Sequence, residues 1–195
     1  MRKLIMAAAV EELNENSIRF TMAELAKRLA VSKSTLYEHF LSKEDLIAAV
    51  VESLLDTVRQ QDEVIINSGM TIQEKLKALL LTEPNMGGLV SSRFIFDLKR
   101  SMPDIWKKCD EYHEYSWKRV ETLLSQGVAD KYFRPIDLNI AKVIYRATID
   151  KLLHENYLIQ NNLTVLDTIK KAMDILYYGL AARETDPFLE SDGRR

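Results

Sequence analysis

Apolar and polar residues recur along this chain with the period of an α-helix. Between residues 22 and 29 the apolar positions fall three and four residues apart, the spacing of a helix with one buried face. Residues 43–66 repeat this pattern over a longer segment that ends at Asn67-Ser68-Gly69. Only six Gly and four Pro occur in 195 residues, which also favours a mostly helical protein. The expected helices span residues 1–16, 21–29, 32–40, 43–66, 71–81, 89–100, 103–126, 137–160 and 164–183.

Three hydroxyl residues mark helix starts near the amino terminus. Thr21 followed by Glu24 has the spacing of a capping box, in which each side chain bonds the other residue's backbone N–H. Ser32 and Ser42 are the next N-cap candidates. Two short helices joined by a few residues, with a third helix directly after them, form a helix-turn-helix unit.

The second helix of this unit has an unusual outer face. Its apolar residues, Leu36 and Phe40, predict the buried side, and its other side carries polar and amphipathic groups. A helix that lies in the major groove of DNA needs such a face. Lys33 can donate to guanine O6 and N7, and Ser34 can pair with several bases. Donors suited to phosphate oxygens come from Thr35, Tyr37, His39 and Lys43. The backbone N–H groups at the helix starts marked by Thr21 and Ser32 can add anion contacts.

The segment VSKSTLYEHFLSKEDL, residues 31–46, resembles the recognition helix and the start of the fourth helix of the TetR family of bacterial repressors. The resemblance is specific over residues 1–50. It implies an all-α fold of about nine helices, with a helix-turn-helix DNA-binding domain over residues 1–46 and an effector-binding and dimerisation domain over residues 47–195. It also implies that bases are contacted by Lys33, Ser34 and Tyr37, and phosphates by Thr21, Thr35, Tyr37, His39 and Lys43.

Three positions depart from the family pattern. Ala30 and Ser34 stand where Gly is common, and Glu38 stands where an apolar, aromatic or basic residue is usual. An acidic side chain at position 38 either accepts from cytosine N4 or repels phosphate. A protein that kept this fold and lost DNA binding is therefore one alternative.

Charge and cysteine content fit a cytoplasmic regulator. The whole chain carries a net charge of −2, but residues 19–43 hold five basic and two acidic residues, a local charge of +3. DNA affinity depends on such local charge. The single Cys109 excludes an intramolecular disulfide and fits a reducing compartment. No apolar run is long enough to span a membrane.

The last two expected helices have apolar stripes wide enough for a dimer interface. Two such helices from each of two chains make a four-helix bundle, and the alternative is that both stripes only fill the core of one chain. A twofold dimer places two recognition helices about one turn of DNA apart, which predicts a palindromic operator. The stripes consist of Leu138, Ala141, Tyr145, Ile149, Leu152, Leu166, Ile169, Met173, Leu176 and Leu180, widened by Ile140, Ile144, Thr148, Tyr177 and Tyr178.

Aromatic residues concentrate between residues 85 and 160 and suggest a pocket for a small lipophilic effector. We call residues 1–46 the head and residues 47–195 the body. By the family resemblance, such an effector moves the helices that join the body to the head, and this movement releases a repressor from DNA. The expected pocket walls are Phe94, Trp106, His113, Trp117, Tyr145 and Arg146.

A metal-binding helical bundle or enzyme is the alternative from another class. Asp110 with His113, and Asp150 with His154, lie three and four residues apart and can share a helix face. The two spacings differ, and such a site needs additional bridging carboxylates. The sequence contains no Gly-rich phosphate loop, Cys cluster or nucleophile elbow. We therefore expect no catalytic residues, no metal and no cofactor.

Overall fold

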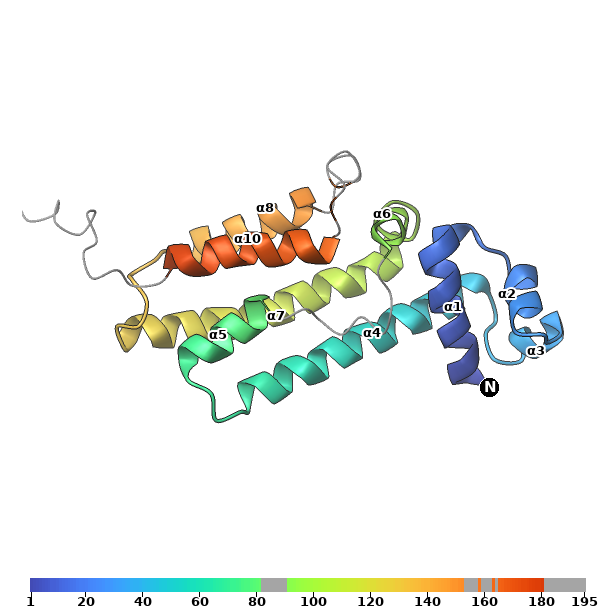
Figure 1. The fold of residues 1–195 in the computed structure, drawn as a ribbon, viewed down its shortest axis with the longest axis horizontal. Coiled ribbons are helices and arrows are strands. Elements are labelled where there is room, and N and C mark those ends of the chain that lie inside the picture. Colours follow the sequence, from blue (N-terminus) through green and yellow to red (C-terminus); the bar gives the residue numbers. More distant parts are fainter. Residues whose placement is uncertain (82–90, 153–157, 159–162, 164, 181–195) are drawn as a thin grey trace, which may run out of the picture.

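The protein is described by a computed structural model that covers residues 1–81, 91–152, 158, 163 and 165–180 (Figure 1). These residues form α-helices and one short 3-10 helix, with no strand among them, and this confirms the all-α class. The helices of the amino-terminal part are α1 (Arg2–Asn16), η1 (Ser17–Arg19), α2 (Met22–Arg28), α3 (Lys33–Tyr37) and α4 (Lys43–Ile66). The remaining ones are α5 (Ile72–Leu81), α6 (Ser92–Ser101), α7 (Pro103–Ala129), α8 (Leu138–Leu152) and α10 (Val165–Leu180).

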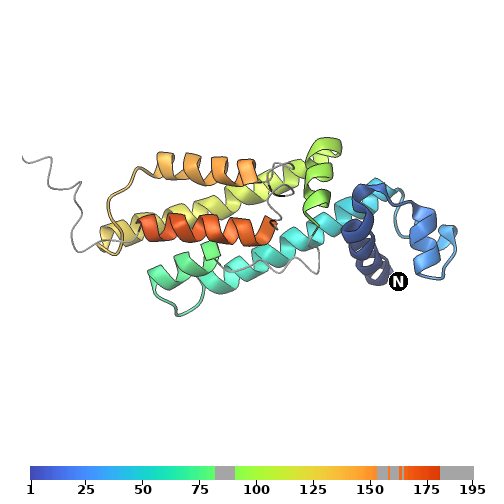
Figure 2. The same ribbon diagram turned by 45° about the horizontal axis from the view of Figure 1, so that its top comes forward.

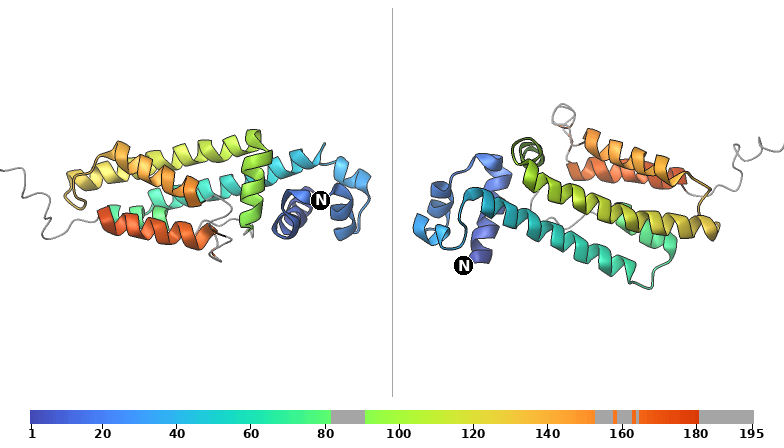
Figure 3. Two further views of the ribbon diagram at one scale, coloured as in Figure 1. Left: turned by 90° about the horizontal axis from the view of Figure 1, so that it is seen from above. Right: turned by 180° about the vertical axis from the view of Figure 1, so that it is seen from behind.

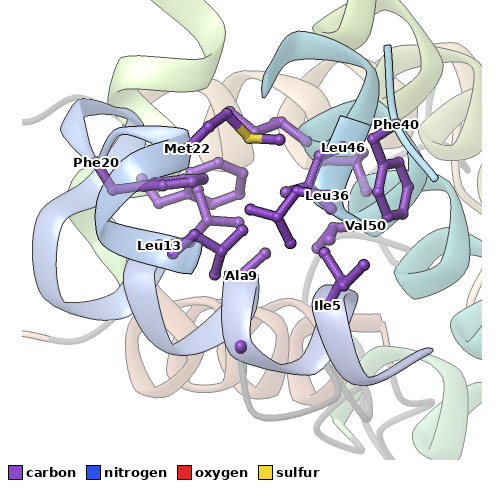
Figure 4. Packing of buried hydrophobic residues seen from close by; sticks show 14 of the residues in the cluster. Ile5, Ala9, Leu13, Phe20, Met22, Leu36, Phe40, Leu46 and Val50 are labelled. Carbon is purple, nitrogen blue, oxygen red and sulfur yellow. The ribbon is translucent and has the colours of Figure 1, made fainter. Parts of the chain in front are cut away.

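The amino-terminal helices enclose a core of their own, which we call the head core. Side chains from α1, α2, α3 and the first turns of α4 converge on it, as Figure 4 shows. The burial of these apolar groups provides most of the stability of this small unit. The labelled members in that view are Ile5, Ala9, Leu13, Phe20, Met22, Leu36, Phe40, Leu46 and Val50.

The long helix α4 joins the head to the body. It runs beside α7, α5 packs against both of them, and α10 packs against α5 and α8 (Figures 1 and 2). A second core, made largely by α5 and α7, contains Leu76, Trp117 and Phe133, all almost fully buried. Helices α8 and α10 lie beside each other on one side of the body.

The three N-caps expected near the amino terminus are all present. Thr21 and Glu24 form a complete capping box, and the hydroxyls of Ser32 and Ser42 each accept a backbone N–H three residues on. A second capping box joins Thr71 and Glu74 at the start of α5. Hydrogen bonds over three residues are the part of a fold that a sequence pattern encodes most directly.

The helix over residues 103–126 was expected to end just before Gly127, and this expectation is wrong. The helix continues to Ala129, so Gly127 lies inside its last turn. A Cβ at Gly127 would lie 2.2 Å from Cδ2 of Phe133, which is buried. The glycine is needed there for close packing of the following loop, not for termination. Helix α6 also begins later than expected, at Ser92, with the side chain of Ser91 as its N-cap.

The turn between α2 and α3 holds Ala30 at a φ of 53°, in the left-handed region. Backbone N–H groups of Ala30 and Val31 donate to the carbonyls of Lys27 and Ala26, the two bonds of a Schellman motif. Glycine is the usual residue at this position because a Cβ is crowded there. The departure noted in the sequence therefore leaves a strained alanine directly before the recognition helix.

Replacing Ala30 by Gly is expected to stabilise the protein by about 0.5–1 kcal/mol. The left-handed conformation costs alanine about 1–2 kcal/mol, and the greater freedom of glycine in the unfolded chain offsets about 0.4–1 kcal/mol of the gain. Urea denaturation measures the difference. Ala7→Gly on the exposed side of α1 is the matched control, and it should destabilise by about 0.5–1 kcal/mol. Loss of stability in both variants would contradict the strain at Ala30.

Candidate DNA-binding site

Helix α3 docks on the head core through one side and turns its other side to solvent. Leu36 is its fully buried residue, whereas Ser32, Lys33 and Ser34 are exposed. Tyr37 is 47 % exposed, so it is not part of the core. Thr35 and His39 are partly exposed at the edges of this face. The predicted DNA-facing residues of α3 and its caps therefore form one continuous outer surface.

The hydroxyl groups on this surface bond one another. Ser32 Oγ lies 2.6 Å from Ser34 Oγ and 2.9 Å from Thr35 Oγ1, and it also accepts the backbone N–H of Thr35. To contact a base, the hydroxyl of Ser34 would have to give up its hydrogen bond to Ser32 Oγ. Lys33 forms no such hydrogen bond in the described structure and is exposed to solvent.

Arg2 fixes the carboxyl end of the recognition helix. Its Nη1 donates to the carbonyl oxygen of His39 at 2.8 Å, and its guanidinium lies 4.1 Å from the centre of the Phe40 ring. These contacts join the start of α1 to the turn after α3. No local sequence pattern predicts this role of Arg2, because the contact joins residues 37 positions apart.

Lys43 lies differently from the expectation of a free phosphate donor. Its ammonium group donates to the carbonyl oxygens of Ile18 and Phe20 at 3.0 and 3.2 Å. Those carbonyls lie at the end of η1 and in the turn before α2, where no helical N–H pairs with them. Two of the three donors of Lys43 therefore hold the head together, and one remains for a phosphate.

Arg28 does not add to the positive surface counted in the sequence. It forms ion pairs with Glu11, Glu12 and Glu15 of α1. Glu12 is only 3 % exposed and also accepts from Asn16 Nδ2, so this cluster ties α2 to α1. The net charge of +3 for residues 19–43 thus overstates the charge that faces DNA.

The six residues expected to line an effector pocket are divided among several places. Phe94 is buried in the head core, and Trp106 packs at the edge of that core. Arg146 pairs with Asp110 at 3.1 Å beside a polar surface groove. Only Trp117 and Tyr145 line the apolar cavity of the body, with ring centres 5.4 Å apart.

His113 has an environment that keeps it neutral. Burial is the main cause that lowers its pKa to about 4, and the nearby positive charge of Arg146 acts in the same direction. Asp110 and Asp150 act in the opposite direction but do not compensate for burial. At neutral pH this imidazole is therefore uncharged, and it does not line the apolar cavity of the body.

The apolar stripes of α8 and α10 divide into an inner and an outer part. Ala141, Tyr145 and Met173 face the cores of their own chain. Five neighbouring apolar residues are instead exposed, two of which, Val143 and Ile175, were not recognised in the sequence. The exposed fractions are 56 % for Ile140, 62 % for Val143, 44 % for Ile144, 74 % for Ile175 and 56 % for Tyr178. Ile149, Leu152, Leu166 and Leu180 have side chains outside the described part of the chain.

The carboxylates considered as metal ligands are paired with basic groups. Asp110 pairs with Arg146, and Asp150 pairs with Lys99 at 3.2 Å. His154 lies outside the described residues. In the parts of the chain that the structure covers, no three His, Cys, Asp or Glu side chains are grouped for metal binding. No helix there combines the length and hydropathy that a membrane span requires.

Comparison with known proteins agrees with this geometry. The sequence model of the bacterial regulatory proteins of the tetR family matches residues 5–50. An uncharacterised HTH-type transcriptional regulator, YvaF of Bacillus subtilis, is 28 % identical over 185 residues, which cover 94 % of this chain and 97 % of that protein.

Two solved structures illustrate the shared fold. A transcriptional regulator from Saccharomonospora viridis in complex with choline has a TM-score of 0.74 at 16 % identity, covering 93 % of this chain and 98 % of that one. FadR of Bacillus subtilis in complex with stearoyl-CoA has a TM-score of 0.64 at 19 % identity, covering 92 % of this chain and 100 % of that one. Residues 5–50 match the TetR family, and the chain is similar over 94 % of its length to an HTH-type transcriptional regulator; both findings support a DNA-binding transcriptional regulator of TetR type.

Proposed function

We propose that the protein is a cytoplasmic homodimeric repressor, without enzymatic activity, that leaves a palindromic operator when a small lipophilic molecule binds its body. Residues 1–46 form the DNA-binding domain in this proposal, and residues 47–195 bind the effector and the second subunit. The observation that carries it is the outer face of α3, where Lys33, Ser34 and Tyr37 are exposed on a helix whose other side is buried. Thr21, Ser32, Thr35, His39 and Lys43 are assigned to phosphates.

The exposed apolar face of α8 and α10 supports the dimer. Soluble monomers rarely expose five large apolar side chains on two adjacent helices. Pairing this face with a second copy around a twofold axis gives a four-helix bundle. The complexes of related folds with choline and stearoyl-CoA support a small-molecule effector for this chain as well.

Helix α6 is the proposed route from the body to the head. It crosses between the start of α7 and α1, as Figure 3 shows. Asn14 Oδ1 accepts the backbone N–H of Ser91 at 3.1 Å, and Ser17 Oγ donates to Asp97 Oδ2 at 2.6 Å. Phe94 of α6 is inserted into the head core. A shift of α6 therefore changes the position of the head. The effector can favour the shifted state over the DNA-bound state only by the difference between its affinities for the two.

Ser17→Ala is expected to lower the free energy of unfolding by about 1–3 kcal/mol, because the carboxylate of Asp97 loses a donor at a site that is only partly open to water. Ser17 is 1 % exposed and has φ 55° and ψ −142°, a conformation that favours glycine. Ser17→Gly loses the same hydrogen bond and relaxes this strain, so it should cost about 1 kcal/mol less than alanine. Chemical denaturation measures the free energy of unfolding of both variants. A smaller loss in Ser17→Ala than in Ser17→Gly would contradict the backbone strain at Ser17.

The test of DNA binding uses a palindrome selected from random duplexes by the purified protein. Tyr37→Ala should weaken its binding by about 1–3 kcal/mol on every selected sequence. Lys33→Ala should relax the preference at one base position in each half-site, because a base contact specifies sequence and a phosphate contact does not. Gel-shift titrations at fixed salt measure both effects.

Lys3→Ala removes an exposed charge from α1 and is the control, with expected affinity close to that of the unmodified protein. Failure of the purified protein to select any DNA sequence would refute the repressor and favour a TetR-like protein without DNA binding. Unchanged affinity in Tyr37→Ala would refute the docking of α3 in the groove.

A further inference from the structure

A cavity of about 360 Å³ lies in the body between α5, α7, α8 and α10. We propose that this cavity binds an amphiphile with one apolar chain and a single anionic head group, and that Arg134 at its edge holds the head. The inference rests on the proposed function, since it names the class of effector and the place where it binds. The volume of the cavity falls at the lower end of the usual range for small-molecule pockets.

The cavity wall is suited to an alkyl chain. Most of its lining is aliphatic or aromatic, with Val120 and Leu124 of α7 facing Leu176 of α10. The Trp117 and Tyr145 rings, tilted by 37° to each other, form one side. Removal of an alkyl chain from water into such a wall contributes about 25 cal/mol per Å² of apolar surface. An apolar chain therefore gains most by filling this space.

The polar groups of the lining offer a cationic head no uncompensated negative charge. Burial raises the pKa of Tyr145 to about 12, so its hydroxyl is neutral. Asp137 is the acidic residue of the lining, and its Oδ1 accepts the backbone N–H groups of Asn139 and Ile140 at 2.8 and 3.2 Å. This carboxylate therefore caps the positive end of α8 and is already compensated.

Arg134 supplies the positive charge. Its Nε donates to the carbonyl oxygen of Gly179 at 2.9 Å, which holds the guanidinium beside the end of α10. In the described part of the chain Arg134 forms no ion pair, and its two terminal nitrogens remain for a ligand. A guanidinium held in this way presents a fork that matches the two oxygens of a carboxylate or phosphate.

The entrance of the cavity lies on the outer face of α8 and α10. Ile140 and Ile175 line the cavity, although they are 56 % and 74 % exposed. The cavity therefore opens to solvent beside these two side chains. This is the face proposed for dimerisation. In the dimer, the bound chain is therefore enclosed in part by the second copy.

The experiment compares three probes with the same twelve-carbon chain: dodecanoate, dodecan-1-ol and dodecyltrimethylammonium, each below the concentration at which it aggregates. Trp106→Phe leaves Trp117 as the single tryptophan, so its fluorescence reports on the cavity wall. We expect dodecanoate to bind at least about tenfold more tightly than the other two, as a charge-assisted contact predicts.

Two substitutions at position 134 test the head group. Arg134→Ala should lower the affinity for dodecanoate about tenfold, to that of the alcohol, and leave the alcohol unchanged. Arg134→Lys keeps the charge and should retain a preference for dodecanoate. Arg59→Ala removes a surface arginine of α4, and it should bind all three probes like the parent protein. Ala141→Leu fills the cavity and should weaken all three.

Equal affinity for the three probes, or tightest binding of the ammonium, would overturn the anionic head. Unchanged dodecanoate binding in Arg134→Ala would overturn the role of Arg134. Absence of binding by any probe, in both fluorescence and calorimetry, would overturn the cavity as the site. DNA selection by the ligand-free protein separates these failures from failure of the proposed function, because it does not depend on an effector.

Discussion

Leu36→Ala is expected to abolish specific DNA binding and to lower the stability of the head by about 2–5 kcal/mol. Helix α3 contains five residues, far fewer than an isolated helix needs to persist in water. Leu36 is its one fully buried side chain, 0 % exposed, and it lies in the centre of the head core (Figure 4). The recognition helix therefore keeps its position through the packing of this leucine.

Leu41→Ala is the matched control for this prediction. Leu41 lies four residues after the end of α3 and is 88 % exposed, so its truncation removes the same atoms without opening a cavity. Urea denaturation and gel shifts on a selected palindrome measure both variants. The prediction fails if Leu36→Ala binds DNA as Leu41→Ala does. A loss of head stability with an intact dimer would show that the body folds without the recognition helix.

The features predicted correctly from the sequence are those that depend on neighbouring residues. The bounds of α4, residues 43–66, follow from the cap at Ser42 and from an uninterrupted helical period, and the structure has the same bounds. The capping box of Thr21 is a contact across three residues. The exposed face of α3 follows from the positions of Leu36 and Phe40 in its helical period.

The features missed in the sequence depend on residues far apart along the chain. Gly127 reads as a stop signal until the ring of Phe133 is known to pack on it. Arg28 counts as a free positive charge until α1 is known to bring three glutamates to it. The aromatic residues of the body share helices, yet they face different cores, and only the packing of α5, α7, α8 and α10 shows which of them line a cavity.

Val143→Asp is expected to convert the protein to a monomer and to weaken binding to a palindromic site by more than about a hundredfold. Val143 is 62 % exposed on α8, between Ile140 and Ile144, in the middle of the proposed interface. A carboxylate buried there against an apolar partner costs several kcal/mol when nothing pairs with it. Two joined heads bind a palindrome far more tightly than one, because the second contact is intramolecular. Sedimentation equilibrium and gel shifts measure the two losses.

Val64→Asp separates the loss of the interface from the effect of a new surface charge. Val64 is 72 % exposed on α4, and the substitution is chemically the same. It should leave both the dimer and DNA affinity close to those of the unmodified protein, and neither variant should change the stability of the monomer by much, since both side chains already face water. If Val143→Asp stays as dimeric as Val64→Asp, the stripes of α8 and α10 do not form the interface, and the spacing of the two recognition helices must be set by another surface.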